Sequence, residues 1–179
     1  MANSWAGLTA APALGMAAVI TWTGGTGSAW VSTGSGRHLL DIVQVGVRAG
    51  PAQPGGAAYP DAGPHFFAAW GAGEPAKGEY TEVDLGPAKS GPHRFAVKWT
   101  GRTWDLSVDG VLRRRVPARP WTAQNVRAMA ESHGGPLPHV AIEKVRRMAG
   151  RAWTTAGLSY IATGTNERPD WGLDWMRTV

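Results

Sequence analysis

Apolar and polar residues alternate along much of the chain with the period of two that is typical of β-strands. In the segment 41–48, three valines fall on one side, while Gln44 falls on the other with a glycine and an arginine. The segment 104–108 alternates in the same way, and the Asp109-Gly110 pair after it predicts a tight hairpin turn. Similar patterns predict further strands at 65–70, 79–85, 94–99, 111–116, 140–148, 158–163 and 173–179. So many short strands predict an all-β fold of two packed antiparallel sheets.

The segment 122–131 fits two structures. As a helix it would be capped by Thr122 and would end before the glycine pair at 134–135. As a strand it would place four residues on one face, namely Asn125, Arg127, Met129 and Glu131. We expect the strand, because of the family resemblance given below.

Composition narrows the class of protein. The 179 residues include 25 glycines and 13 prolines at 43% hydrophobic content, which is typical of a turn-rich globular chain and predicts one domain over 1–179. The chain has no cysteine, which excludes disulfides, thiolate metal sites and a thiol nucleophile. The first sixteen residues lack the basic start and the sustained apolar stretch of a secretion signal, so we expect a cytoplasmic protein without a membrane partner.

Charge and histidine spacing exclude other functions. The net charge is +5, but the cations are not interleaved with stacking aromatic residues, so we expect no nucleic-acid partner. The five histidines show no metal-ligand spacing, and we expect neither a metal nor another cofactor. No Gly-x-Ser-x-Gly motif is present to support a serine nucleophile.

A series of short motifs, in order over nearly the whole chain, resembles the glutamic peptidases, or eqolisins. The resemblance implies a jelly-roll sandwich of the concanavalin A or lectin type. It rests on Asn3-Ser4-Trp5-Ala6-Gly7, Ile20-Thr21-Trp22-Thr23, Ser28-Ala29-Trp30-Val31, Asp41-Ile42-Val43-Gln44-Val45-Gly46, Phe67-Ala68-Ala69-Trp70 with Glu74-Pro75, and Ala130-Glu131.

The resemblance also implies a pair of catalytic residues. Gln44 would donate a hydrogen bond to a tetrahedral oxyanion, and Glu131 would act as the general base on water. The family's strand carries two glutamates four residues apart, and if Glu131 aligns with the second, the first falls on Arg127. On the strand of Gln44, the missing side chain of Gly46 would leave room for a ligand.

The chain has ten tryptophans, more than core packing alone requires, so we expect some of them to line a binding groove. Trp5, Trp30 and Trp70 are the candidates for substrate binding, whereas Trp99 and Trp104 alternate with core residues. Two functions fit these features. One is a peptidase-like hydrolase acting on an extended, peptide-like substrate, and the other is a binding or natural-product biosynthetic protein that takes a peptide or small-molecule ligand on the same sandwich.

Overall fold

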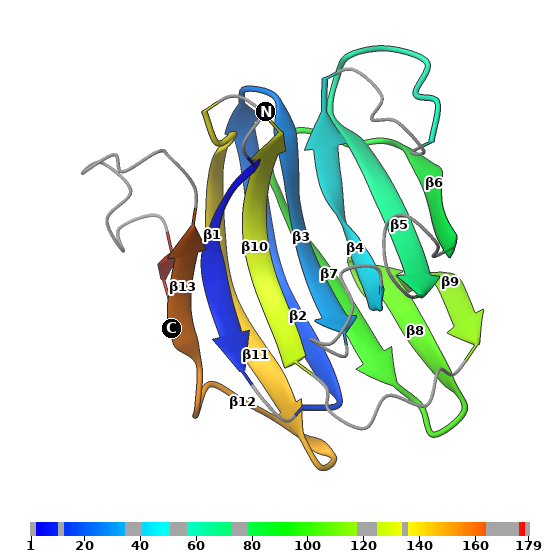
Figure 1. Cartoon of the computed structure of the whole chain (residues 1–179), viewed down its shortest axis with the longest axis vertical. Coiled ribbons are helices and arrows are strands. Elements are labelled where there is room, and N and C mark those ends of the chain that lie inside the picture. Colours follow the sequence, from blue (N-terminus) through cyan, green and yellow to red (C-terminus); the bar gives the residue numbers. More distant parts are fainter. Residues whose placement is uncertain are drawn as a thin grey trace.

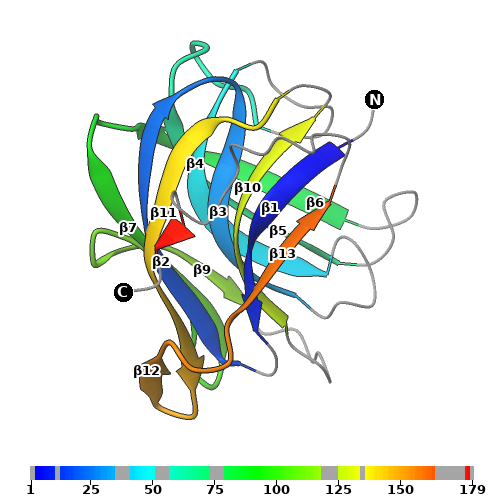
Figure 2. The same cartoon turned by 90° about the vertical axis from the view of Figure 1, so that its left-hand side faces the viewer.

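The chain forms two stacked antiparallel sheets, which Figures 1 and 2 show from the front and from the side. The computed structural model describes residues 3–10, 13–34, 41–50, 57–72, 79–117, 125–133, 136–163 and 176–177. These described residues include no helix, and hence no helix that could cross a membrane. The all-β sandwich expected from the sequence is therefore confirmed.

Sheet A is the front layer in Figure 1 and has seven strands. Their order across the sheet is β13 (Ser159–Thr163), β1 (Asn3–Ala10), β10 (Asn125–His133), β3 (Gly27–Gly34), β4 (Ile42–Ala49), β5 (His65–Ala72) and β6 (Glu79–Pro87).

Sheet B lies behind sheet A. Six of its strands lie side by side, and a short seventh strand pairs with one of them. The order is β12 (Ala152–Thr154), β11 (His139–Ala149), β2 (Gly15–Gly24), β7 (Pro92–Trp99), β8 (Thr103–Val108) and β9 (Val111–Pro117), and β14 (Met176–Arg177) pairs with β11. Of the predicted strand at 173–179, the structure describes only β14.

The core lies between the sheets and follows the alternation in the sequence. The three valines of β4 are at most 3% exposed, and Trp104, Leu106 and Val108 of β8 are fully buried. Asp109 and Gly110 connect β8 to β9 with φ angles of 53° and 78°, as a two-residue turn of type I′ requires. The predicted hairpin is confirmed.

The segment whose sequence allowed a helix or a strand forms β10, in the middle of sheet A. β10 pairs with β1 on one side and with β3 on the other, so both edges of its backbone are used in the sheet. These pairings satisfy its backbone N–H and C=O groups as fully as a helix would. The strand prediction is confirmed, and it places Arg127 and Glu131 on the same face of sheet A.

Candidate functional site

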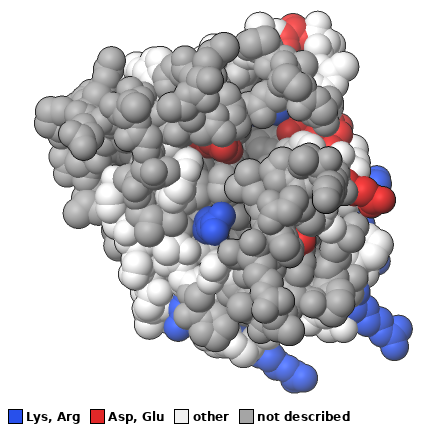
Figure 3. All heavy atoms as spheres, viewed as in Figure 1, with Lys and Arg blue, Asp and Glu red and all other residues white. Residues whose placement is uncertain are grey.

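The candidate site is the outer face of sheet A, defined as the side turned away from sheet B. Cross-strand pairing aligns the residues of this face in rows, two of which carry most of its polar groups. The Gln44 row consists of Thr9, Arg127, Ser32, Gln44, Ala69 and Glu82, and the Arg48 row of Trp5, Glu131, Ser28, Arg48 and His65. Figure 3 looks onto this face and shows acidic and basic atoms close to its middle.

A buried ion pair joins the two rows on the β4 to β6 side of the face. Arg48 pairs with Glu82, and their side chains are only 5% and 2% exposed. Tyr59 donates its hydroxyl to Glu82 Oε1 at 2.7 Å, and Tyr80 donates to Oε2 at 2.9 Å. The Arg48 guanidinium also lies 5.1 Å from the centre of the Tyr59 ring. Glu82 is thus a carboxylate whose two oxygens are fully engaged, which makes it an anchor of the site and a poor general base.

The two tyrosines are held as hydrogen-bond donors. Burial raises the pKa of both Tyr59 and Tyr80 above the usual range, and the charge of Glu82 with its hydrogen bonds raises them further. Gln44 Nε2 in turn donates to the Tyr80 hydroxyl at 3.4 Å. Gln44 is therefore positioned by the same network that satisfies Glu82.

His65 ties this network to the segment 57–64. Its ring is 1% exposed, with Nδ1 at 3.1 Å from Asp84 Oδ1 and Nε2 at 3.3 Å from Asp61 Oδ1. Burial lowers the pKa of His65, but the hydrogen bonds and charges of the two carboxylates outweigh burial and raise it above its ordinary value. The protonated ring donates to both carboxylates, whereas the neutral ring can donate to only one.

The raised pKa predicts a pH dependence of stability. A His pKa above the unfolded value of about 6.5 stabilises the fold fully below that pH, and the contribution is lost as pH rises through the folded pKa. We expect the free energy of unfolding of the native protein, measured with urea, to fall as the pH rises from about 6.5 through the pKa of folded His65. The free energy of unfolding of His65→Gln should fall less over the same pH range. An NMR titration of His65 that gives a pKa at or below 6.5 would contradict the assignment.

The structure places Gln44 and Glu131 on the same face but in different rows. Two strand spacings and four residues along the strand separate them, or about 16 Å between their Cα atoms. Glu131 accepts a hydrogen bond from Trp30 Nε1 at 3.2 Å, whereas Gln44 contacts Tyr80. The two side chains expected to act together thus have separate partners.

Two of the three tryptophans proposed for substrate binding lie on the outer face. Trp30 is 5% exposed in a cluster with Phe67 and Met129, and the half-buried Trp5 packs against this cluster. Trp70 lies on the inner face instead, packed against the main core, with the Arg114 guanidinium 4.8 Å from the centre of its ring. The prediction that Trp70 lines the substrate groove is therefore wrong. Trp70 pairs across the sheet with Val43, and paired residues point to the same face, which here is the core.

Gly46 also differs from the expectation. A Cβ atom at this position would lie 2.6 Å from the Cβ of Trp30 and 2.1 Å from the carbonyl oxygen of Ala29. The missing side chain therefore makes room for the neighbouring strand and for Trp30, and the glycine serves packing within the sheet.

Arg127 is a second cation of the outer face, in addition to Arg48, that the sequence did not assign a role in the site. It is half-buried, and burial lowers the pKa of its guanidinium, although an arginine stays charged in proteins. Among the described residues its guanidinium has no carboxylate partner and no hydrogen bond. It shares a row with Gln44, at two strand spacings or about 10 Å between Cα atoms.

Sequence reasoning missed Arg48, Tyr59, Tyr80 and Glu82. A usable signal was present for two of them, because Tyr80 and Glu82 alternate with apolar residues and fall on one side of β6. Their pairing with Arg48, 34 residues away from Glu82, depends on the order of the strands in the sheet.

Comparisons with known proteins show a likeness in architecture only. No protein-family model matches the sequence, and no curated protein matches it. Among solved structures, the chain is similar to a mixed-linkage glucan GH16 protein of Bacteroides ovatus in complex with a G4G4G3G product, at 11% identity, TM-score 0.49, and coverage of 89% of this chain and 80% of that one. It is also similar to a glycoside hydrolase family 16 endo-glucanase from Bacteroides ovatus, with the same identity and coverage and a TM-score of 0.47. Neither likeness carries information on substrate or reaction.

Proposed function

We propose that the outer face of sheet A binds a peptide-like or small-molecule ligand through its carboxylate, with Arg127 as the anchor. The observation that carries the proposal is the half-buried guanidinium of Arg127, which has no carboxylate partner among the described residues. A desolvated charge without a counter-ion is costly, and an anionic ligand offsets that cost. The planar guanidinium also matches a carboxylate with two parallel hydrogen bonds.

A second polar atom of this face lacks an acceptor. Arg48 Nε is buried and has no hydrogen-bond partner among the described residues, although the same guanidinium pairs with Glu82. Buried donors of this kind are nearly always satisfied in native proteins, by protein or by a bound molecule. Because this atom is closed to solvent, an enclosed water is the acceptor that fits it, and Arg127 remains the anchor for the ligand.

The surroundings of Arg127 favour a ligand with an aromatic or apolar body. The cluster of Trp30, Phe67 and Met129 lies in the row next to Arg127, with Trp5 at its edge. Indole rings provide large contact areas at low conformational cost and suit extended chains or flat rings. Ser32, between Arg127 and Gln44, adds a hydroxyl to the same row.

The position of Arg127 also argues for binding over hydrolysis. The resemblance to glutamic peptidases implies two glutamates four residues apart on this strand. If Glu131 corresponds to the second glutamate, Arg127 stands at the position of the first. Arg127 lies in the same row as Gln44. A guanidinium there cannot accept a proton from water. A carboxylate-binding site derived from a hydrolytic one fits this substitution.

Hydrolysis is the second candidate, and Glu131 is the observation that favours it. Its carboxylate is half-buried on the same face and is oriented by the indole N–H of Trp30, as a general base requires. If the protein is a hydrolase that uses Glu131 as its base, Glu131→Gln abolishes turnover of unstructured peptides without lowering stability. Under the binding proposal, the native protein shows no turnover that Glu131→Gln removes, at acid or at neutral pH.

The binding proposal is tested with two ligands that differ only in charge. N-acetylphenylalanine carries a carboxylate, and N-acetylphenylalaninamide carries a neutral amide in the same place. We expect the acid to bind at least about ten-fold more tightly than the amide, because a hydrogen bond to a charged group contributes roughly 1.5 to 3 kcal/mol. Calorimetric titration measures both affinities, and equal affinities would refute the proposal.

A further inference from the structure

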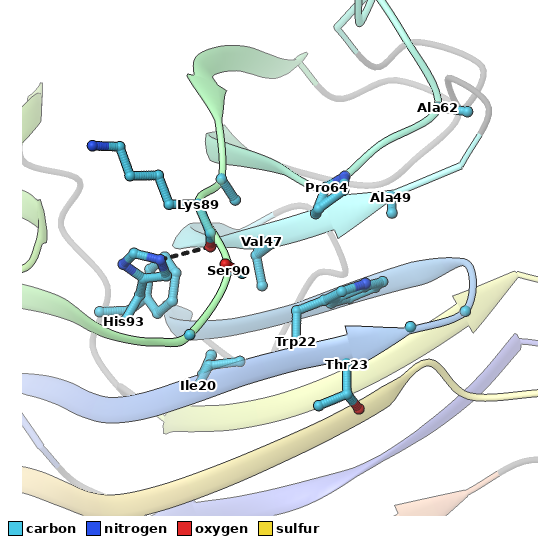
Figure 4. Close-up of a pocket in the computed structure, with 15 residues that line it drawn as sticks. Ile20, Trp22, Thr23, Val47, Ala49, Ala62, Pro64, Lys89, Ser90 and His93 are labelled. Carbon is cyan, nitrogen blue, oxygen red and sulfur yellow. Dashed lines mark hydrogen bonds between the residues drawn. The ribbon is translucent and has the colours of Figure 1, made fainter.

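A pocket of about 470 Å³ lies between the two sheets, on the other side of sheet A from the outer face. Its walls come from β2, β4 and β7, together with residues of the segments 62–64 and 88–91 (Figure 4). Figure 4 shows the indole of Trp22, Ile20 and Val47 turned toward one space, with His93 to one side. Phe95 completes the apolar part of the wall.

Small residues at this end of the sandwich explain why the pocket exists. Ala49 ends β4 on the inner face, and Ala88 follows β6, where larger side chains would meet the opposite sheet. Sheets stack about 10 Å apart, a spacing that larger inward side chains normally fill. Trp22 is left half-buried beside this space.

Two polar side chains of the pocket are engaged within the protein. His93 Nδ1 lies 2.7 Å from Asp109 Oδ2, and His93 Nε2 lies 2.9 Å from the carbonyl oxygen of Lys89. Thr23 donates its hydroxyl to the carbonyl oxygen of His139 at 3.0 Å. Ser90 is exposed at the edge of the pocket and can donate to an incoming group.

We infer that this pocket binds a small, flat, mainly aromatic molecule that carries one hydrogen-bonding substituent. Ile20, Val47 and the indole of Trp22 give the pocket an apolar wall that a flat ring can cover. Ligand sites of this size are typically apolar with a small number of placed polar groups. The two sheets and the indole of Trp22 favour a ring system between them, with its polar substituent toward Ser90.

The test uses 2-naphthol as the ligand and the native chain labelled with ¹⁵N. We expect saturable binding, with a dissociation constant on the order of a millimolar or below, as for small fragments. The amide of Gly91 and the indole N–H of Trp22 should show large chemical-shift changes, while Arg127 should not respond. A titration without saturation, or shifts confined to the outer face of sheet A, would overturn the inference.

Two matched variants locate the binding in the pocket. Ala49→Leu adds a side chain to the lining, and we expect it to weaken 2-naphthol binding at least about ten-fold, because it occupies the space of the ring. Ala58→Leu makes the same change at an exposed residue outside the lining and should bind 2-naphthol like the native protein. Equal affinity of both variants would overturn the inference. The shift map of the native chain decides the question if Ala49→Leu does not fold.

Discussion

Replacing Glu82 with glutamine is expected to lower the free energy of unfolding by about 3 to 5 kcal/mol, because it leaves the Arg48 guanidinium buried without a counter-charge. Both side chains of this pair are at most 5% exposed. Each carboxylate oxygen of Glu82 accepts a hydrogen bond from one tyrosine hydroxyl. Glutamine has an NH₂ group in place of one of these oxygens, so one of the two tyrosines loses its acceptor. Urea denaturation of the two proteins at neutral pH measures the difference.

Asp105→Asn is the matched control for this prediction. Asp105 pairs with Arg115 on sheet B at 3.1 Å, and the arginine side chain is 65% exposed. Solvent screens such a pair, so the control should lose less than about 1 kcal/mol. A loss for Glu82→Gln that is no larger than the loss for Asp105→Asn would show that the Arg48 and Glu82 pair does not stabilise the outer face.

Arg127→Met is expected to weaken the binding of N-acetylphenylalanine by about 10-fold to 100-fold. A loss of this size corresponds to losing one charge-assisted hydrogen bond at the lower end and a bidentate pair at the upper end. The same variant should keep or raise the stability of the protein, because it removes a desolvated charge that has no carboxylate partner among the described residues. Lost binding with retained stability is the signature of a functional residue kept at a structural cost.

Arg113→Met is the control for the Arg127 variant. Arg113 lies exposed on β9 of sheet B, so the variant removes the same charge from another surface. Its affinity for N-acetylphenylalanine should match that of the native protein. If the two variants bind the ligand equally well, net charge and not the outer face of sheet A accounts for the attraction.

The sequence predicted the parts of the fold that depend on local pattern. The valines of β4 and the Asp109-Gly110 turn follow from alternation and from the φ angles that a two-residue turn requires. β10 was ambiguous in isolation, because its residues fit a helix as well as a strand. Pairing with β1 and β3 settles its structure, and that pairing joins segments about a hundred residues apart along the chain.

The site depends on register, which no local pattern contains. Gln44 shares its row with Arg127 and not with Glu131, because of how β10, β3 and β4 align side by side. Trp70 was assigned to the wrong face because β5 is apolar on both sides, so alternation alone does not show which side is the core. The ion pair of Arg48 and Glu82 also depends on the order of the strands, which brings these two side chains together in a buried position.

A crystal structure of the protein with N-acetylphenylalanine shows whether Arg127 anchors a carboxylate on the outer face of sheet A. We expect a carboxylate oxygen of the ligand at about 3 Å from a guanidinium nitrogen of Arg127, as a hydrogen bond requires. We also expect the phenyl ring of the ligand to lie against Trp5 or Trp30, with Gln44 and Ser32 together on one side of the ligand. A ligand bound on sheet B, or on sheet A with its carboxylate away from Arg127, would show that Arg127 is not the anchor.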